Sequence, residues 1–329
     1  MPRDVRIEKP PDRHRVNPPG PAFRFTAPPI LRMGRDRLGY LTELARTYGD
    51  VAYVRIGVER LYLVSHPELI REVLVTHSRN FEKGRGLDRV KRLLGEGLLT
   101  SEGEHHLRQR RMIQPVFHHQ RIAGWARTMS ERAVQHTAAW RDGEERDIVA
   151  EMTRLTLAIV GDTLFGVDVG SEAAEISRAL TSLMESFYMM MLPFPGLIER
   201  LPLPKVRRMR AARDHLDGVI FRLIDERRKS GAQGDDLLSM LLAAQDTEGD
   251  GTGMSNEQVR DEALTIFLAG HETTANALSW TWWLLGQHPD VERRLHEELE
   301  RVLAGRAPGA ADYGALTYTE QIVTESMRL

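Results

Sequence analysis

The feature that most constrains the fold is one long helical pattern, which begins after Ser255 and continues to Leu285. Ser255 and Gln258 have the spacing of a capping box, and the next proline is Pro289. About 30 residues at 1.5 Å each make a helix of roughly 45 Å, whereas helices in globular proteins average about 11–12 residues. Because the pattern is apolar on most sides near Trp280–Leu285, this helix must run through the middle of a domain.

The rest of the sequence is mostly helical in pattern, with one small β element near its start. Apolar residues at helical spacing predict a helix over Arg37–Tyr48. Two short β-branched and apolar runs, Val51–Ile56 and Leu61–Val64, predict a hairpin. Residues 1–29 are rich in proline and predict an extended, poorly ordered segment. We therefore expect one mostly helical domain over residues 30–329.

Two further helices follow the long one. The first begins at Pro289, carries one apolar stripe and ends at Gly305. The second has the capping-box residues Thr317 and Glu320, and its pattern is still helical at Leu329. Because a natural domain rarely ends in mid-helix with its last carbonyls unsatisfied, we expect that the sequence has been cut.

The composition excludes several kinds of chemistry and of partner. The 329 residues include no cysteine, which rules out disulfides, Cys-ligated zinc or iron–sulfur clusters, thiol nucleophiles and thiolate ligands. Lys plus Arg number 45 against 47 for Asp plus Glu, so the net charge of −2 gives no reason to expect nucleic acid. No window reaches the roughly 18 apolar residues of a membrane span, and residues 1–21 lack the apolar segment of a secretory signal. We expect a cytoplasmic protein.

Small and polar residues interrupt the long helix at residues 269–274, whose sequence is AGHETT. A glycine inside a helix costs about 1 kcal/mol relative to alanine, and a buried acid adds a desolvation cost. The segment is therefore either a tolerated kink with a satisfied polar pair or a groove for a large flat ligand. In the second case Glu272 and Thr273 would handle protons. His271 and Glu272 begin like the zinc-protease pattern, but Ala275 stands where that pattern needs a second histidine.

A basic helix is predicted over Glu102–Phe117. His106 and Arg110 are four residues apart and share one of its faces. This face is either a solvated basic surface or an anion clamp, since arginine holds carboxylates with two hydrogen bonds. The neighbouring pairs His105-His106 and His118-His119 do not converge on one helix face, which disfavours a metal site.

An acidic stretch, Asp246–Gly251 followed by Glu257, resembles a calcium-binding loop. The match is imperfect because Glu248 replaces the usual Asp or Asn, and Gly253 stands at a position that is normally apolar. We interpret the stretch as an acidic loop between helices.

Two other patterns carry little information alone. Glu325 and Arg328 are three residues apart, which is the spacing of an ordinary exposed ion pair on a helix. The Met-rich segment Met189–Met191 is either core filler or a pliable binding surface.

In their order and spacing these patterns resemble the cytochrome P450 family. Residues 269–274 resemble the oxygen-activation motif on the long central helix of that family, and residues 325–328 (ESMR) resemble its Glu-x-x-Arg motif. His106 and Arg110, followed by residues 114–118 (QPVFH), resemble the Trp-x-x-x-Arg helix, with His in place of Trp. The resemblance covers the chain beyond the proline-rich segment. It implies a mainly α, cytochrome P450-like helical domain with a small N-terminal β element.

The resemblance implies a haem b cofactor and a monooxygenase reaction. Such an enzyme splits dioxygen with two electrons and two protons and inserts one oxygen atom into an apolar substrate. Ala269 and Gly270 would lie against the distal face of the haem. Glu272 and Thr273 would be catalytic and would relay protons to dioxygen.

The same resemblance assigns the remaining site residues. His106 and Arg110 would bind the haem propionates, and Glu325 and Arg328 would be structural. A separate electron-transfer partner of the ferredoxin or flavoprotein reductase type is implied. The substrate class stays open, since lipid-like molecules, terpenoids and polyketides all fit an apolar site.

One departure from the family pattern is severe. The family continues for roughly another hundred residues beyond Glu-x-x-Arg and carries there the Cys whose thiolate binds the iron, whereas this sequence has no Cys and ends directly after Arg328. We expect a P450 whose C-terminal quarter is missing, with no metal ligand in the chain and no activity by itself. The alternative is a non-catalytic helical fragment, or the remnant of a truncated gene, that does not bind haem stably.

Overall fold

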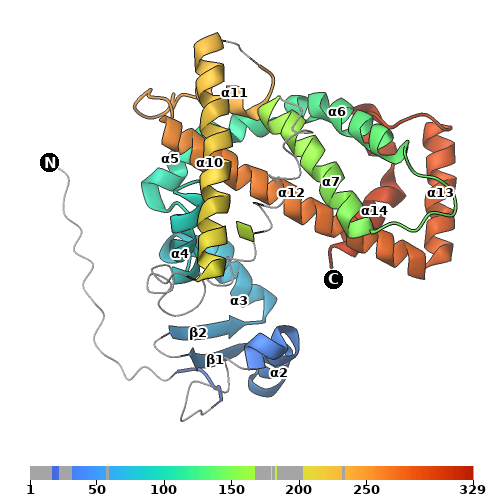
Figure 1. Cartoon of the computed structure of the whole chain (residues 1–329). Coiled ribbons are helices and arrows are strands. Elements are labelled where there is room, and N and C mark those ends of the chain that lie inside the picture. The colour runs from blue at the N-terminus through green and yellow to red at the C-terminus, as the bar shows by residue number, and fades with distance from the viewer. Residues whose placement is uncertain are drawn as a thin grey trace. The chain divides into compact units, whose positions relative to one another are not determined.

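The computed structural model describes residues 17–21, 32–56, 59–166, 179, 182–183, 203–231 and 234–328 (Figure 1). The chain divides into two compact units, Met1–Glu82 and Lys83–Leu329. Most of residues 1–29 and all of Met189–Met191 lie outside the described residues, so the predictions for those segments stay predictions.

The first unit contains the predicted helix and hairpin. α2 (Arg37–Tyr48) begins after Asp36, whose carboxylate accepts a hydrogen bond from the N–H of Gly39 at 2.9 Å. β1 (Val51–Ile56) pairs antiparallel with β2 (Glu59–Val64). The short helices of this unit are α3 (Pro67–Arg71), η1 (Glu72–Thr76) and η2 (Ser78–Asn80). Its small core consists of Tyr40, Leu44, Ala52 and Val54.

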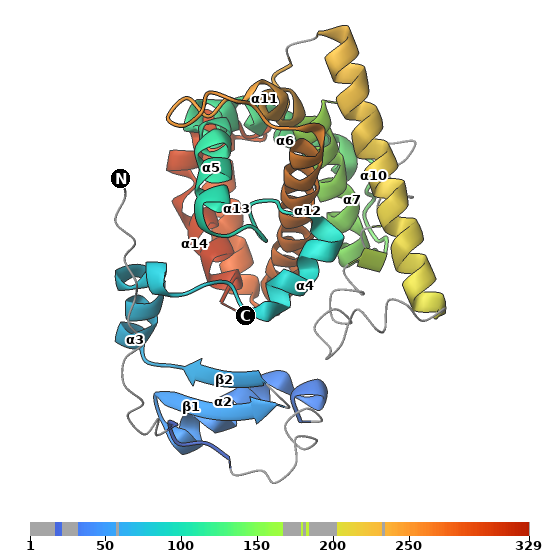
Figure 2. The same ribbon diagram turned by 90° about the vertical axis from the view of Figure 1, so that its left-hand side faces the viewer.

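The regular elements described in the second unit are helices, apart from one isolated β-bridge between Gln245 and Gly253 (Figure 2). Its first helices are α4 (Arg85–Leu94), α5 (Gly103–Ile113), η3 (Gln114–Phe117), α6 (His119–Thr137), α7 (Ile148–Val160) and η4 (Gly161–Phe165). The later ones are α10 (Pro204–Ser230), α11 (Leu237–Ala243), α12 (Asn256–Gln287), α13 (Pro289–Leu303), η6 (Ala310–Ala315) and α14 (Thr317–Ser326). The mainly α fold with a small β element is therefore confirmed.

α12 is the long helix that the sequence predicted, and it organises the second unit. Its capping box is present, since Ser255 and Gln258 exchange hydrogen bonds of 3.2 and 2.9 Å. α7 runs alongside α12 in both views, and α10, α11, α13, α14 and α4 also contact it (Figures 1 and 2). The large core of this unit includes Val259, Ala263 and Phe267 of α12, none of them more than slightly exposed. Burial on several sides between Val259 and Leu268 stabilises this half of the helix. Near the other end Trp280, Trp282 and Trp283 are about half exposed, so the expectation that this end lies in the middle of a domain is wrong.

The second predicted capping box, at Thr317 and Glu320, is wrong. α14 has no capping hydrogen bond from its own sequence. Instead the buried carboxylate of Glu298, on α13, accepts hydrogen bonds from the backbone N–H groups of Tyr318 and Thr319, both at 2.8 Å. A carboxylate satisfies two free amides at once and carries the charge that a helix N-terminus favours. The contact between Glu298 of α13 and the start of α14 thus takes the place of the predicted local capping box.

Among the described residues, no helix combines the length and the hydrophobicity that crossing a membrane requires.

Candidate active site on the central helix

The segment 269–274 lies within α12 and has a buried and an exposed side. His271 and Ala275 are buried, whereas Ala269 and Thr273 are exposed. The hydroxyl of Thr273 donates a hydrogen bond to the carbonyl of Ala269 at 2.5 Å. Because α12 continues unbroken from Asn256 to Gln287, the polar residues do not end the helix.

Gly270 is not required by the packing of the described residues. A Cβ at this position would meet only a methyl group of Val160, at an ordinary contact distance of 3.6 Å. With Ala269 exposed beside it, Gly270 contributes to a strip of α12 from which no large side chain projects. A flat molecule could lie directly against such a strip.

His271 points away from this strip and into the interior. Only 2% of its surface is exposed, and its Nε2 lies 3.3 Å from the backbone carbonyl oxygen of Thr153 on α7. Its Nδ1 is buried without a hydrogen-bond partner among the described residues and lies 3.9 Å from Oε2 of Glu272. Burial lowers the pKa of His271, so the ring is neutral at physiological pH.

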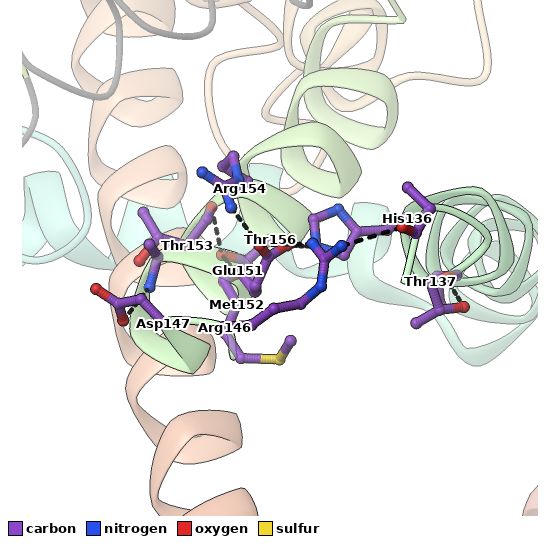
Figure 3. Close-up of polar contacts among 12 residues, drawn as sticks. His136, Thr137, Arg146, Asp147, Glu151, Met152, Thr153, Arg154 and Thr156 are labelled. Atoms are coloured by element: carbon purple, nitrogen blue, oxygen red, sulfur yellow. Dashed lines mark hydrogen bonds and ion pairs between the residues drawn. The ribbon is translucent and has the colours of Figure 1, made fainter. Parts of the chain in front are cut away.

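The part of α7 that faces His271 is held by a buried carboxylate. Figure 3 shows Glu151 between His136 of α6, Arg146 of the α6–α7 loop and Arg154 of α7. The distances are 2.7 Å to Nε2 of His136 and 3.3 Å to Nη1 of Arg146, and Arg154 forms a third ion pair. Burial alone would raise the pKa of Glu151, but Arg154 and His136 outweigh it and lower that pKa. These ion pairs fix the helix that carries the Thr153 carbonyl.

On α5, His106 is half-buried rather than free. Its Nδ1 lies 3.4 Å from the hydroxyl of Ser101 and 3.5 Å from the ammonium of Lys83. Burial, and then the nearby charge of Lys83, lower the pKa of His106. The ring is therefore neutral at physiological pH and can donate only one hydrogen bond.

Arg110 lies one helical turn after His106 and is exposed. No hydrogen bond or ion pair joins its guanidinium to another described residue. The two other arginines of α5 do have partners. Arg108 donates to Thr252, and Arg111 donates to Asp246 at 3.1 and 2.9 Å. The guanidinium of Arg110 is therefore available to bind an anion.

The acidic stretch predicted to be a loop connects α11 with α12. Its first carboxylate, Asp246, is buried and bound by Arg111, with Arg108 at 3.6 Å. The Asp250 carboxylate accepts hydrogen bonds from the backbone and hydroxyl of Thr252, at 2.9 and 2.7 Å. These acids therefore fasten the loop to α5. No group of three metal-ligating side chains occurs among the described residues.

The loop before α5 is fastened to α12 by two adjacent acids. Asp261 accepts a hydrogen bond from the N–H of Glu96 at 2.7 Å, and Glu262 accepts one from the N–H of Leu98 at 2.9 Å. Gly97 lies between them, and a Cβ there would stand 2.7 Å from the backbone oxygen of Asp261. Only glycine allows the loop backbone to approach the helix so closely.

Glu325 and Arg328 form an ion pair on α14, with 2.6 Å between Oε2 and Nε. The Glu325 side chain is 73% exposed and the Arg328 side chain is 70% exposed. They line a groove of about 590 Å³ with Leu284, Val291, Tyr318 and Ile322. No contact among the described residues joins this pair to the strip at Ala269 and Gly270 or to His106, and their structural role stays a prediction.

Comparison with known proteins agrees with this geometry. A family model described as Cytochrome P450 matches residues 18–329. The chain belongs to the cytochrome P450 family.

Curated relatives of this P450 cover nearly all of the chain. Cyclooctatin synthase of Streptomyces melanosporofaciens is 40% identical over 96% of the chain and 68% of its own length. Cyclooctat-9-en-7-ol 5-monooxygenase of the same organism is 38% identical, over 91% of the chain and 65% of its length. Pentalenene oxygenase of Streptomyces avermitilis is 35% identical, over 91% of the chain and 66% of its own length. The P450 chain spans about two thirds of the length of these relatives.

The described residues fit the haem that a P450 binds. The exposed strip at Ala269 and Gly270 carries no bulky side chain, as a flat macrocycle requires. Arg110 offers an uncompensated guanidinium of the kind that binds carboxylates with two hydrogen bonds. His106 fits less fully, because Lys83 and Ser101 already approach its Nδ1.

Sequence reasoning missed three residues that shape this site. His271 was considered only as a zinc ligand, and neither Glu262 nor Glu151 was singled out. An acid within an apolar helical stripe is a signal that could have drawn attention to Glu262, since burial of a carboxylate demands a partner. The partners themselves are distant in sequence and could not have been found from local patterns.

Proposed function

We propose that this P450 chain supplies the haem-contacting and dioxygen-activating surface of a monooxygenase that inserts one atom of O2 into an apolar substrate. The observation that carries the proposal is the exposed strip of small residues on a helix whose other side is buried at His271 and Ala275, with an acid and a hydroxyl directly beside it. Haem, when bound, supplies the redox-active iron at which dioxygen is reduced.

The residues of α12 have separate roles in this proposal. Ala269 and Gly270 let the macrocycle approach the helix, because larger side chains would hold it away. Thr273 now donates to the Ala269 carbonyl, and rotation of its side chain would turn that hydroxyl toward the exposed side, where it can pass on a proton. Glu272, whose side chain is 37% exposed, is placed to replace that proton from solvent.

His106 and Arg110 have the role of binding the propionates. The free guanidinium of Arg110 is the stronger of the two candidates, since it is charged at every physiological pH. The neutral ring of His106 can donate one hydrogen bond.

We propose a carbon-rich, terpene-like substrate. The names of two relatives describe oxygenation of an alkene, pentalenene, and of an alkenol, cyclooctat-9-en-7-ol. Electrons would come from a separate ferredoxin or flavoprotein reductase, and the cytoplasmic location stays a prediction.

A thiolate ligand would have to come from outside these residues, since the 329 residues contain no cysteine. The chain by itself is therefore expected to give no thiolate-type spectrum with carbon monoxide after reduction and no monooxygenase turnover. The absence of cysteine is also the observation that favours the second candidate, a helical fragment without stable haem binding.

Titration of the chain with haemin tests the proposal. Ala269→Phe fills the strip with a ring, while Ala123→Phe makes the same substitution at an exposed position of α6. We expect haemin affinity to fall at least tenfold in the first variant and to change little in the second, with both melting like the parent chain. Equal affinity in both variants would contradict the assignment of the strip. No haemin binding by the parent chain would favour the helical fragment.

A further inference from the structure

A short loop covers a buried acid of α12. Residues 95–101 connect α4 with α5, and Glu262, which this loop contacts, has no exposed surface. Oε2 of Glu262 accepts a hydrogen bond from the N–H of Leu98 at 2.9 Å, and Gly97 lies against the hydroxyl of Thr265 one turn further along the helix. Because the loop itself provides these contacts, lifting it would bring the carboxyl of Glu262 into water.

The closed loop is poorly suited to a negative charge. Oε1 of Glu262 is buried and has no hydrogen-bond partner among the described residues. Gln109 of α5, an uncharged residue, lies beside Glu262, but neither polar atom of its amide makes a well-formed hydrogen bond within the described part of the chain. A buried carboxylate needs several donors, and one loop amide does not replace the water that the anion would lose.

The hydroxyl of Thr265 adds a further unpaired atom to this cluster. It is buried and has no partner in the described structure, whereas Thr273 and Thr281 of the same helix each donate to the carbonyl four residues earlier. Thr265, Glu262 and Gln109 thus form a buried polar cluster between α12, the loop and α5. Such a cluster favours a neutral acid, which can both accept and donate, over an anion, which can only accept.

The charged groups around Glu262 do not offset its burial. Burial is the main influence on the pKa of Glu262, which rises from 4.5 to about 7. The bond from Leu98 lowers this pKa, Asp261 beside it on α12 raises it, and Lys83 lowers it. The ammonium of Lys83 donates to the loop carbonyls of Leu98 and Ser101, at 3.0 and 2.8 Å, and makes no hydrogen bond to the carboxyl. With the loop closed, Glu262 is therefore mostly neutral below pH 7.

We propose that residues 95–101 form a pH-sensitive latch on α12, which is closed while Glu262 carries a proton and is released when Glu262 ionises. In the closed state one oxygen of the acid accepts from Leu98, and its O–H can donate to the amide oxygen of Gln109. The O–H bond is the only covalent bond that breaks, and water takes the proton. Opening of the loop then hydrates the anion, and return of the proton restores the closed state.

The latch lies directly before α5, the helix that carries His106 and Arg110. The hydroxyl of Ser101, the last residue of the loop, lies 3.4 Å from Nδ1 of His106, and Lys83 lies 3.5 Å from the same atom. Release of the loop would therefore remove the neighbours that hold the His106 ring. This consequence for propionate binding rests on the proposed function, whereas the latch itself requires no haem and is tested without it.

Hydrogen exchange of the full chain without haem measures the opening of the loop. The loop amides of Glu96, Leu98, Thr100 and Ser101 are hydrogen-bonded, and mass spectrometry of a peptide that covers them reports their exchange. Protection is the exchange rate of the unfolded sequence divided by the measured rate, so the direct effect of pH on exchange cancels. From pH 5 to pH 8 we expect loop protection to fall at least about tenfold, because each unit between the closed and open pKa values is a factor of ten in the opening equilibrium.

Two variants and one internal control assign this effect. Glu262→Gln keeps an acceptor for Leu98 and cannot ionise, so its loop should be protected equally at both pH values. Glu96→Gln removes the same charge from an exposed side chain of the loop itself and should retain the pH dependence of the parent chain. The first turn of α14, which Glu298 holds, reports a segment that does not cover Glu262, and its protection should change little.

Three results would overturn the inference. One is loop protection in the parent chain that is the same at pH 5 and pH 8, a result that requires no variant to fold. Another is the same loss of protection in Glu262→Gln as in the parent chain. The third is an equal loss at the start of α14, which would show that the whole unit opens rather than the loop. If the loop behaves as expected but haemin does not bind, the latch stands and the proposed function fails.

Discussion

Glu262 of α12 accepts a hydrogen bond from the backbone N–H of Leu98, 164 residues earlier in the chain, at 2.9 Å. This bond ties the loop before α5 to the central helix, and α5 carries His106 and Arg110. The Glu262 side chain is fully buried, and its other oxygen lies beside Gln109 without a well-formed hydrogen bond. One bond from an amide does not compensate a buried negative charge, so burial raises the pKa of Glu262 to about 7.

The raised pKa of Glu262 predicts that stability falls as the pH rises. Its ordinary value is 4.5, so the stabilisation is complete below pH 4.5 and is lost progressively up to about pH 7. The loss amounts to at most about 3–4 kcal/mol, since each pKa unit corresponds to about 1.4 kcal/mol. Glu262→Gln keeps an acceptor for Leu98 and cannot ionise. We expect urea midpoints at pH 5 and pH 8 to differ less in this variant than in the parent chain.

Glu300→Gln, at an exposed position of α13, is the matched control for Glu262→Gln. It should leave the difference between the two urea midpoints unchanged. If Glu262→Gln leaves it unchanged as well, Glu262 is not the group that carries this pH dependence.

Gly97 should be intolerant of even the smallest side chain. A Cβ there would lie 2.4 Å from the hydroxyl of Thr265 and 2.7 Å from the backbone oxygen of Asp261, and the backbone oxygen cannot move aside. Overpacking of this kind costs about 1–3 kcal/mol. Gly124 on α6 is the control, because a Cβ there meets nothing within 4 Å. We expect Gly97→Ala to lower the melting temperature and Gly124→Ala to raise it, and the reverse order would show that the loop does not approach α12.

Glu298 should contribute more to stability than an ordinary exposed glutamate of α13. Burial would raise the pKa of Glu298, but hydrogen bonds from Tyr318 and Thr319 outweigh burial and lower it. The contribution of Glu298 is therefore present above its unfolded pKa of about 4.5 and is lost as the pH falls, the opposite slope to that of Glu262. Glu298→Ala leaves two helix N-terminal amides unpaired, at a cost of about 1.5–3 kcal/mol.

Denaturant unfolding of Glu298→Ala and of the exposed variant Glu297→Ala at pH 7 measures this cost. We expect a clear loss in the first and a change within about 0.5 kcal/mol in the second. Similar midpoints would mean that α14 does not depend on α13 for its N-terminal cap.

Local features of the fold could be predicted from the sequence, while its tertiary contacts could not. The bounds of α2 and the Ser255–Gln258 capping box follow from residues at most a few positions apart. The predicted box at Thr317 failed because the cap of α14 comes from Glu298, about 20 residues earlier on α13, which accepts from the N–H groups of Tyr318 and Thr319 and which local patterns do not reveal.

The same reasoning applies to the candidate site. The AGHETT segment stands out because small and polar residues interrupt an apolar helix. His271 could not be assigned, since its partner is the backbone carbonyl of Thr153, 118 residues away, and a carbonyl leaves no mark on side-chain patterns. Whether His106 and Arg110 act together on a ligand also depends on contacts that no sequence spacing reveals.

Arg110 and Arg108 provide the sharpest test of the assigned anion site, because they lie on one helix and differ in their partners. Arg108 donates to Thr252 at 2.7 Å and fastens α5 to the loop before α12, whereas Arg110 is exposed and contacts no described residue through a hydrogen bond or ion pair. Arg108→Ala should therefore reduce stability, by about 1 kcal/mol, with little effect on haemin affinity. Arg110→Ala should leave stability unchanged and weaken haemin binding about tenfold, the loss expected for one charge-assisted hydrogen bond to a carboxylate.

Thermal melts and haemin titrations of both variants, repeated with haemin dimethyl ester, complete the test. The ester has no propionate charge, so the parent chain and Arg110→Ala should bind it equally, and a tenfold difference that persists with the ester would show that Arg110 acts on something other than a propionate.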